Sequence, residues 1–359
     1  MASVTLEGTT KRFGSFTAVQ SMNLAIRDAE FVAILGPSGC GKSTTMNMIA
    51  GIEAPNEGSI HFDGRDVTQV PMDRRGVGFV FQNYALFTHM SVRGNLAFGL
   101  EVQGVPRAET DRRVGEMAEF MALSHRLDAP SASLSVNEMQ KLAIGRSAIV
   151  EPSIFLLDEP LSNLDAAFRE KMRSDLRSLQ RSLKQTMVYV THDQIEAMGL
   201  ADRIAVMDNA TLQQFASPAE IYARPHNTFV AGFIGAPSMN LIPLKMSEGA
   251  ATTPSGPLQL DARLQAQANA HRGSELLLGV RPEDMTLSDT GISARTILVE
   301  TVGRRRIGHF DLGTTRVLGT WERSTPLAAG DLVSLMPDLA KSHLFDPKTG
   351  LRLTHGESS

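Results

Sequence analysis

Residues 36–43 read Gly-x-x-x-x-Gly-Lys-Ser, a pattern whose residue types suit the binding of a triphosphate. The glycines let the backbone curl, so that successive N–H groups point inward at phosphate oxygens. Lys42 is placed to reach the outer phosphates as a point charge, and the hydroxyl of Ser43 is placed to bind magnesium. An apolar stretch at 31–35 precedes the pattern and a helix-like segment at 44–50 follows it. This strand–loop–helix context predicts a phosphate-binding loop.

Two further positions carry acidic and imidazole groups at the ends of apolar strands. Asp158 and Glu159 follow the apolar residues 154–157, and His192 follows the apolar residues 187–190. Asp158 is placed to hold magnesium, directly or through water, and Glu159 is placed to orient or deprotonate an attacking water. His192 is placed to contact a γ-phosphate. A solvated acidic turn is the alternative for the carboxylates, but adjacent carboxylates on a buried strand repel each other unless a cation intervenes.

The segments around these residues follow the periodicities of strands and helices. Residues 1–30 alternate between apolar and polar side chains, which predicts antiparallel strands with turns at Gly8 and Gly14. Residues 92–150 change to a helical pattern. The apolar runs before the two carboxylates and before the histidine are continuous, as buried parallel strands are, and a helical segment lies between them. Together these patterns predict a parallel sheet with a helical insertion.

The composition limits the class of protein. A chain of 359 residues is longer than one compact core of ordinary size, so two domains are expected. The net charge of −4 gives no indication of a nucleic-acid partner. The single cysteine, Cys40, excludes an intrachain disulfide and fits a reducing cytoplasm. The first residues lack a signal pattern, and no apolar run approaches the ~20 residues that span a bilayer, so we expect any membrane role to depend on a partner.

The character of the sequence changes near residue 236. Beyond it, Gly and Pro recur between brief alternating runs, such as those at 276–280 and 297–299, which predicts a small all-β domain. The predicted domains are an N-terminal domain at 1–235, with a helical subdomain at about 83–153, and a C-terminal domain at 236–359.

The order of the motifs resembles that of the ATP-binding cassette (ABC) ATPases. Residues 36–43 match the Walker A loop of that family, and residues 156–160 match Walker B. The family's Q-loop, D-loop and H-loop are matched at Gln82, at 162–165 with its Asp165, and at 190–193. The resemblance implies an α/β P-loop NTPase fold with an antiparallel β subdomain and a helical subdomain, followed by a small all-β domain that is OB-like.

The resemblance also implies that the chain binds ATP with Mg²⁺ and hydrolyses it. The residues that would contact ATP within the subunit are Phe13, Ser38, Gly39, Cys40, Gly41, Lys42, Ser43, Thr44 and Gln82. Phe13 matches an aromatic residue that stacks on adenine in the family. The Mg²⁺ ligands would be Ser43, Gln82 and Asp158, and the catalytic residues would be Glu159 and His192.

Segments beyond the cassette resemble the C-terminal part of ATPases of the maltose-importer type, at 231–237, 279–283 and 343–346. This implies an ATPase subunit that drives bacterial uptake of a sugar, polyol or glycerol phosphate. Its partners would be two transmembrane permease subunits, a second ATPase subunit and, indirectly, a periplasmic or extracellular solute-binding protein. It would lie at the cytoplasmic face of the cell membrane as a peripheral protein. The C-terminal domain would serve dimerisation and regulation.

The ABC signature, normally Leu-Ser-Gly-Gly-Gln, is altered here to Leu134-Ser135-Val136-Asn137-Glu138. In the family this segment opens a helix and contacts the ATP of the opposite subunit through its serine hydroxyl and backbone N–H groups. Ser135-x-x-Glu138 is also a capping box, which turns the glutamate onto the backbone and leaves the serine hydroxyl able to donate to phosphate. The alteration suggests pairing with a paralogous ATPase that carries the consensus signature. A homodimer with two weakened sites is the rival hypothesis.

Other classes of nucleotide-binding protein fit the motifs less well. A nucleotide kinase or GTPase explains neither the D-loop nor the H-loop, and the guanine motif Asn-Lys-x-Asp does not occur. ABC ATPases of repair or translation usually carry coiled-coil arms or two fused cassettes, whereas this chain has one cassette and a β-rich tail. A soluble regulatory ABC ATPase without a permease stays open as an alternative, because the signature is altered.

Overall fold

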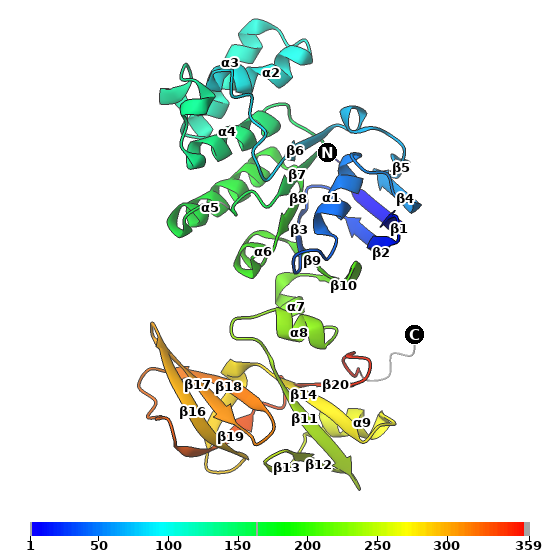
Figure 1. The fold of residues 1–359 in the computed structure, drawn as a ribbon, viewed down its shortest axis with the longest axis vertical. Helices are drawn as coiled ribbons and strands as arrows, with labels where there is room; N and C mark the ends of the chain where they lie inside the picture. The colour runs from blue at the N-terminus through cyan, green and yellow to red at the C-terminus, as the bar shows by residue number, and fades with distance from the viewer. Residues whose placement is uncertain (1, 163, 355–359) are drawn as a thin grey trace. The chain divides into compact units, whose positions relative to one another are not determined.

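The computed structural model describes residues 2–162 and 164–354. The chain divides into two compact units, Met1–Pro218 and Ala219–Ser359 (Figure 1). Within the described residues, no helix is both long enough and apolar enough to cross a membrane.

A six-stranded sheet forms the centre of the first unit, in the order β10-β9-β3-β8-β7-β6. Its strands are β3 (Phe31–Leu35), β6 (Val77–Val80), β7 (Ile154–Asp158), β8 (Thr186–Thr191), β9 (Arg203–Asp208) and β10 (Thr211–Ala216). All neighbouring pairs are parallel except β9 and β10. The parallel strands predicted before the carboxylates and the histidine are therefore confirmed. Because the carboxyl ends of parallel strands meet at one edge, the residues after β3, β7 and β8 lie at the same edge.

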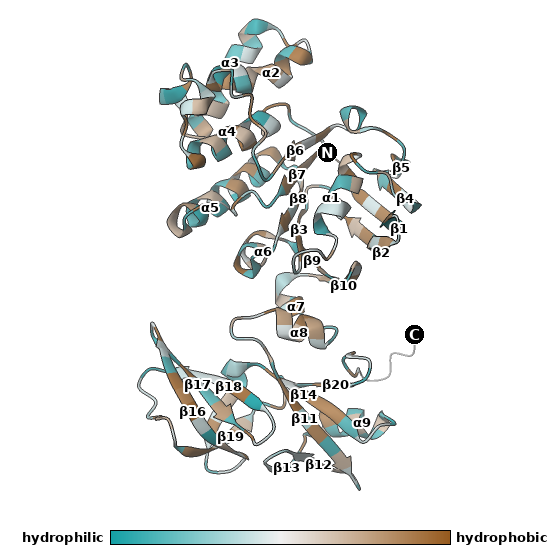
Figure 2. Ribbon diagram, in the orientation of Figure 1, coloured by the Kyte–Doolittle hydropathy of each residue, from teal (hydrophilic) through white to brown (hydrophobic). Residues whose placement is uncertain are grey.

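Both faces of this sheet are buried, and alternate residues of β7 enter different cores. Phe155 and Leu157 join the core on the side of α5 (Ala166–Leu183) and the helical segment. Ile154 and Leu156 join the core shared with α1 (Lys42–Ala50) and the N-terminal strands. This double burial explains why the strand is continuously apolar. Figure 2 shows α5 with mixed hydrophobic and hydrophilic colouring, as expected of a helix with one buried face.

A four-stranded antiparallel sheet in the order β2-β1-β4-β5 packs against the second of these cores. Its strands are β1 (Val4–Phe13), β2 (Phe16–Ile26), β4 (Glu57–Phe62) and β5 (Arg65–Asp66). The predicted turn at Gly14 is confirmed, with a φ of +60°. The predicted turn at Gly8 is wrong, because β1 runs through this residue. Gly8 has a φ of +57° where the pairing with β2 shifts register, so it forms a bulge instead.

The helical pattern predicted for residues 92–150 is confirmed. This segment holds α2 (Val92–Val102), α3 (Arg107–Phe120) and α4 (Val136–Ala148), with short 3-10 turns η2 (Ser124–Arg126) and η3 (Ser131–Ser133). It is inserted between β6, which follows η1 (Met72–Arg74), and β7. Helix α2 packs against both α3 and α4, and α6 (Gln194–Leu200) follows β8 (Figure 1).

The second unit contains two five-stranded antiparallel sheets that share one core. The first sheet has the order β13-β12-β11-β14-β20, from β11 (Asn240–Ser247), β12 (Ala250–Thr253), β13 (Gly256–Leu258), β14 (Glu275–Val280) and β20 (His343–Phe345). The second has the order β15-β19-β16-β17-β18, from β15 (Met285–Ser288), β16 (Ile292–Val302), β17 (Arg305–Asp311), β18 (Arg316–Glu322) and β19 (Leu332–Pro337). The predicted β domain is confirmed.

Helical elements accompany these sheets. They are α7 (Pro218–Ala223), α8 (Thr228–Phe233), α9 (Ala262–Ala270) and the 3-10 turn η4 (Pro282–Asp284). Helix α9 was not predicted; it begins where Asp261 accepts a hydrogen bond from the N–H of Leu264. Helix α8 contributes Ala231 to a small core with Met239 and Phe345. Along the chain, the boundary between the compact units follows Pro218, whereas the sequence changes character near 236. The domain limits 1–235 and 236–359 stay a prediction.

Candidate functional site

The loop between β3 and α1 has the backbone of a phosphate-binding turn. Gly39 and Gly41 have φ values of +80° and +104°, which glycine adopts without strain. A side chain at Gly41 would meet the carbonyl oxygen of Ala18 at 2.2 Å, and one at Gly36 would meet that of Met207 at 2.3 Å. Only glycine therefore fits at both ends of the loop. Helix α1 starts directly after it, so its first N–H groups face the space that the loop encloses.

The ammonium group of Lys42 lies inside this loop. The residue is 5% exposed, and its Nζ donates to the carbonyl oxygens of Gly36 and Pro37 at 2.9 and 2.8 Å. Cys40 is buried beside it, and burial raises the pKa of the Cys40 thiol. The thiol is therefore neutral near pH 7, and the loop contributes one positive charge, that of Lys42.

The remaining predicted ATP contacts lie on the rim of the loop and on the β1–β2 hairpin. Ser38 and Gly39 are exposed, and Thr44 is half-buried in the first turn of α1. Phe13 ends β1 and is 47% exposed, opposite Phe16, which is 59% exposed. The hairpin thus presents two aromatic faces for stacking, and the sequence analysis singled out only the first.

Ser43 and Asp158 bring two oxygen atoms together at the edge of the sheet. Ser43 Oγ donates to Asp158 Oδ1 at 3.3 Å. Burial raises the pKa of Asp158, and the charge of Glu159 raises it further, against the opposing effect of Ser43. A bound cation would relieve both effects. The described residues contain no cluster of three His, Cys, Asp or Glu side chains that could hold a metal. One hydroxyl and one carboxylate nevertheless fit Mg²⁺, which uses few protein ligands when phosphate oxygens complete its shell.

Glu159 lies at the centre of a second group of contacts at the same edge. Its Oε1 lies 3.3 Å from His192 Nδ1, and its Oε2 accepts from Gln82 Nε2 at 3.5 Å. Its backbone has a φ of +44°, and its N–H donates to the carbonyl of Val190 at 3.0 Å. A non-glycine residue in this conformation is strained and persists only when its surroundings hold it. The contacts thus form two groups, Ser43 with Asp158 and Glu159 with its two partners, which lie together because Asp158 and Glu159 are adjacent in the chain.

The signature segment forms the predicted capping box at the start of α4. Ser135 Oγ accepts from the N–H of Glu138 at 3.3 Å, and Glu138 Oε2 accepts from the N–H of Ser135 at 2.9 Å. The structure differs from the expectation in one respect. The Ser135 hydroxyl also donates to Glu138 Oε2 at 2.8 Å, so its one proton is used within the segment. The backbone N–H and hydroxyl of Ser135, with the charge of Arg126, lower the pKa of Glu138.

The other substituted signature residues are Val136, which is 43% exposed, and Asn137, which contacts the D-loop of its own chain. Asp165 caps α5 by accepting from the N–H of Phe168 at 2.9 Å. This bond lowers the pKa of Asp165, and the side chain of Asn137 adds to the effect. Asn163, the second residue of the D-loop match, lies outside the described residues.

Within the described residues, the structure gives no hydrogen bond or ion pair from the signature segment or Phe13 to the cluster around Glu159. Arg169 was not among the predicted site residues, and its guanidinium contacts Leu164 of the D-loop match and Asp193 of the H-loop match. No motif marks Arg169 among the other basic residues of α5. The available signal is its place one turn after the capping Asp165, where a helical side chain points back toward the helix start.

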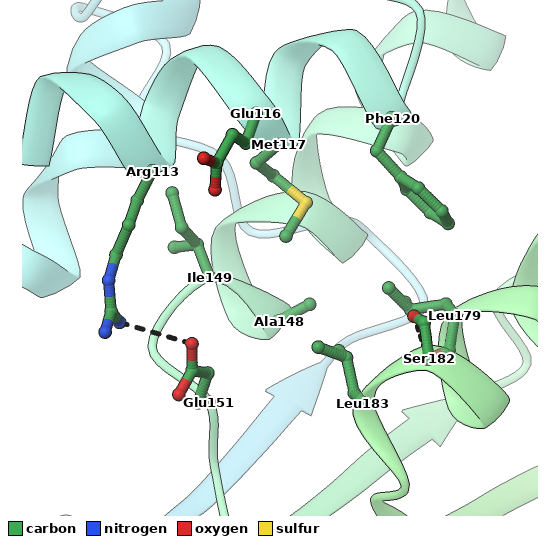
Figure 3. Close-up of a pocket in the computed structure, with 10 residues that line it drawn as sticks. All are labelled: Arg113, Glu116, Met117, Phe120, Ala148, Ile149, Glu151, Leu179, Ser182 and Leu183. Atoms are coloured by element: carbon green, nitrogen blue, oxygen red, sulfur yellow. Dashed lines mark hydrogen bonds and ion pairs between the residues drawn. The ribbon is translucent and has the colours of Figure 1, made fainter.

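A separate cavity of about 230 Å³ lies between α3, the end of α4 and the end of α5 (Figure 3). Its apolar wall includes Met117, Phe120 and Leu183, and Arg113 pairs with Glu151 at 3.4 Å on its rim. Helix α5 runs from the D-loop to this cavity, and its 18 residues span roughly 27 Å. The cavity is therefore not part of the nucleotide cluster.

The fold and site define a P-loop nucleotide-binding protein of the cassette class, and comparisons with known proteins agree. The family model described as ABC transporter matches residues 19–162, and that described as MalK OB fold domain matches residues 235–285. The structure of CbiO1 from Clostridium perfringens, part of the ABC transporter complex CbiONQ, is similar with a TM-score of 0.58. It is 28% identical, and the match covers 62% of this chain and 90% of that one.

Two relatives match along almost the entire chain. The trehalose/maltose import ATP-binding protein MalK of Thermococcus litoralis is 41% identical, over 98% of this chain and 99% of the relative. The sn-glycerol-3-phosphate import ATP-binding protein UgpC of Ruegeria pomeroyi is 42% identical, over 98% of this chain and 99% of the relative. The chain belongs to the ATP-binding proteins of ABC transporters, with a MalK-type OB domain, and it is an ATPase.

Proposed function

We propose that this chain is the ATP-hydrolysing subunit of a bacterial importer for a sugar, a polyol or a glycerol phosphate. The contact between Glu159 Oε1 and His192 Nδ1, beside the Ser43–Asp158 pair, is the observation that carries the hydrolytic part. The import part is supported by two relatives whose names specify import of trehalose/maltose and of sn-glycerol-3-phosphate. A soluble regulatory ABC ATPase without a permease is not favoured, because the two relatives that match almost the entire chain are named as import proteins.

Phe13, the phosphate-binding loop and the residues near Asp158 each have a role in ATP binding and hydrolysis. Phe13 stacks on adenine, the loop amides of residues 38–44 bind phosphate oxygens, and the Lys42 ammonium neutralises negative charge. Ser43, Gln82 and Asp158 would hold Mg²⁺, which would neutralise phosphate charge.

Glu159 and His192 act on the attacking water. Glu159 accepts the proton of this water as its oxygen bonds to the γ-phosphorus, and the bond from that phosphorus to the β–γ bridging oxygen breaks. The imidazole of His192, 3.3 Å from Glu159, orients the carboxylate and the γ-phosphate.

Coupling to transport requires partners in the membrane. We place two permease subunits against the helical segment and the Q-loop segment, where large apolar side chains are exposed at Phe81, Phe98 and Val102. Through them the chain is held at the cytoplasmic face of the cell membrane, and an external solute-binding protein delivers the solute. Closure of two ATPase subunits on two ATP molecules switches the access of the pathway, and hydrolysis resets it.

The importer role is tested by purifying the tagged chain from its own cells in mild detergent. We expect a polytopic membrane protein to co-purify and the complex to hydrolyse MgATP after reconstitution in vesicles. Repeated purification of the chain without any polytopic membrane protein would contradict the importer role.

The altered signature supports pairing with a paralogous ATPase. In a head-to-tail dimer the signature of one subunit faces the ATP of the other, where Ser135 would have to donate a proton that Glu138 already accepts at 2.8 Å. Glu138 also places a negative charge beside that ATP, because a glutamate whose pKa lies below its ordinary value is ionised near pH 7. A paralogue with the consensus signature would complete the site at this chain's own P-loop.

Turnover of the chain purified alone separates a heterodimer from a homodimer. If the chain forms a heterodimer, the chain alone should hydrolyse ATP slowly and should not dimerise when ATP is added. Addition of the paralogue should then give both fast turnover and an ATP-driven dimer. Strong ATP-driven self-dimerisation and turnover would support the homodimer instead.

A further inference from the structure

The guanidinium group of Arg169, on α5, joins the two turns that carry Glu159 and His192. Its Nη2 donates to the carbonyl oxygen of Leu164 at 3.2 Å, and its Nη1 donates to Asp193 Oδ2 at 3.3 Å. Leu164 belongs to the turn after β7, and Asp193 follows β8. One planar cation therefore contacts both turns at once.

On the β7 side, the turn is hydrogen-bonded back to Glu159. Ser162 donates to the carbonyl oxygen of Glu159 from its N–H at 3.3 Å and from its hydroxyl at 3.0 Å. The N–H of Leu164 donates to the carbonyl oxygen of Leu161 at 3.3 Å. A displacement of Leu164 is consequently transmitted to the backbone of Glu159.

On the β8 side, the residues that flank His192 are held by a buried acid. The N–H of Asp193 donates to Thr191 Oγ1 at 3.0 Å, and Thr191 Oγ1 donates to Glu196 at 2.6 Å. Glu196 is 3% exposed, and the Nε of Arg169 lies 3.8 Å from it. A buried carboxylate with hydrogen-bond donors and a nearby cation forms a stiff network.

The contacts close into a ring. It runs from Glu159 through its turn to Leu164, then to Arg169, to Asp193 and to His192, which lies 3.3 Å from Glu159. We propose that Arg169 is a positioning residue that sets the separation of Glu159 and His192 by holding the two turns in one arrangement. This inference rests on the proposed function, which supplies the catalytic roles of the pair.

The geometry requires arginine rather than a positive charge alone. The two terminal nitrogens of a guanidinium point in fixed, different directions and reach two acceptors together. A lysine carries one ammonium on a flexible chain, so it satisfies either the Leu164 carbonyl or Asp193 with good geometry. Arg169→Lys therefore separates bridging from simple charge neutralisation.

The kinetic test compares Arg169→Met and Arg169→Lys with Arg173→Met. Arg173 is the matched control, because it lies one turn further along α5 and pairs with Glu170. Turnover is measured in the ATP-hydrolysing assembly, and MgATP affinity is measured separately. We expect Arg169→Met to lower kcat at least tenfold with affinity within twofold of wild type. The kcat of Arg169→Lys should lie between those of Arg169→Met and the wild type, and the kcat of Arg173→Met should equal that of the wild type. A kcat for Arg169→Met within twofold of the control, or a loss confined to affinity, would overturn the proposal.

Hydrogen exchange provides a readout that does not need turnover. Peptides containing Leu164 and peptides containing Asp193 should both exchange faster in Arg169→Met than in Arg173→Met, while β3 stays unchanged. Faster exchange in only one of the two turns, or in neither, would contradict the bridge. Absence of turnover in the wild-type assembly would instead contradict the proposed function, and the exchange experiment would still test Arg169.

Discussion

At the scale of single residues, Glu159 combines an unusual backbone conformation with side-chain contacts to two other predicted site residues. Its φ of +44° is a conformation that a glutamate adopts only when its neighbours hold it, and its two carboxylate oxygens face His192 and Gln82. Sequence reasoning identified the carboxylate because a strand tip with two acids is unusual. It could not identify the left-handed backbone, at which the N–H of Glu159 donates to the carbonyl oxygen of Val190 on β8.

Replacement of Glu159 tests its role as the base. Glu159→Gln keeps the size of the side chain and its contacts with Gln82 and His192, but an amide does not accept the proton of water. We expect MgATP affinity to stay within about twofold and turnover to fall at least ~100-fold, the lower range for loss of a general base. Glu170→Gln, on the exposed face of α5, is the control. Near wild-type turnover for Glu159→Gln would show that another group is the base.

Glu138 is the residue that tests the effect of the altered signature. In Glu138→Gln a neutral oxygen still accepts from the N–H of Ser135, but the bond to the serine hydroxyl loses its charge assistance. We expect the apparent affinity of the two-chain assembly for ATP to rise roughly tenfold, which is about 1.4 kcal/mol. Turnover is measured against ATP concentration, with Glu101→Gln on α2 as the control. An unchanged or lower affinity would show that Glu138 does not oppose ATP.

At the scale of elements, strands were easier to predict than their irregularities. Continuous apolar runs identified β7 and β8, because double burial leaves no polar face to alternate. The bulge at Gly8 was mistaken for a turn, since a glycine in a short alternating strand suits both and only pairing with β2 decides. Helix α9 was missed, because a nine-residue helix in a β-rich segment gives a weak periodic signal.

The link between β20 and α7 predicts an acid-sensitive step in the second unit. His343 is 8% exposed, its Nε2 donates to the carbonyl oxygen of Ala223 at 2.7 Å, and burial lowers its pKa from 6.5 to about 4. Between pH 4 and pH 6.5, the imidazole of His343 therefore binds a proton more readily in the unfolded chain than in the folded one. The contribution of neutral His343 to the free energy of unfolding is full above pH 6.5. It is lost as the pH falls towards 4, by up to about 3 kcal/mol.

Thermal unfolding between pH 7 and pH 4 measures this loss. His343→Gln does not titrate and keeps a donor for the Ala223 carbonyl, so its unfolding temperature should depend less on pH than that of the wild type. His89→Gln replaces an exposed histidine and should keep the wild-type dependence. Equal pH dependence in His343→Gln and wild type would show that another group governs the acid step.

At the scale of the whole molecule, the class of protein was accessible from the sequence because its motifs are local. Each motif, from the Walker loops to those of Gln82 and His192, spans only a few adjacent residues. The residue types within each motif can be explained by the chemistry of nucleotide binding. Contacts between distant segments were not accessible. The bridge made by Arg169 is such a contact, because Asp193 lies 24 residues further along the chain.

The entire account depends on the chain's own loop holding a triphosphate, and equilibrium dialysis of MgATP measures this directly. The wild-type chain, alone or with its paralogue, should retain ATP. Lys42→Ala should bind roughly 100-fold more weakly, because the cation inside the loop is lost, while Lys171→Ala on the exposed face of α5 should bind as wild type. Failure of the wild type to retain ATP, or equal retention by Lys42→Ala, would contradict the account.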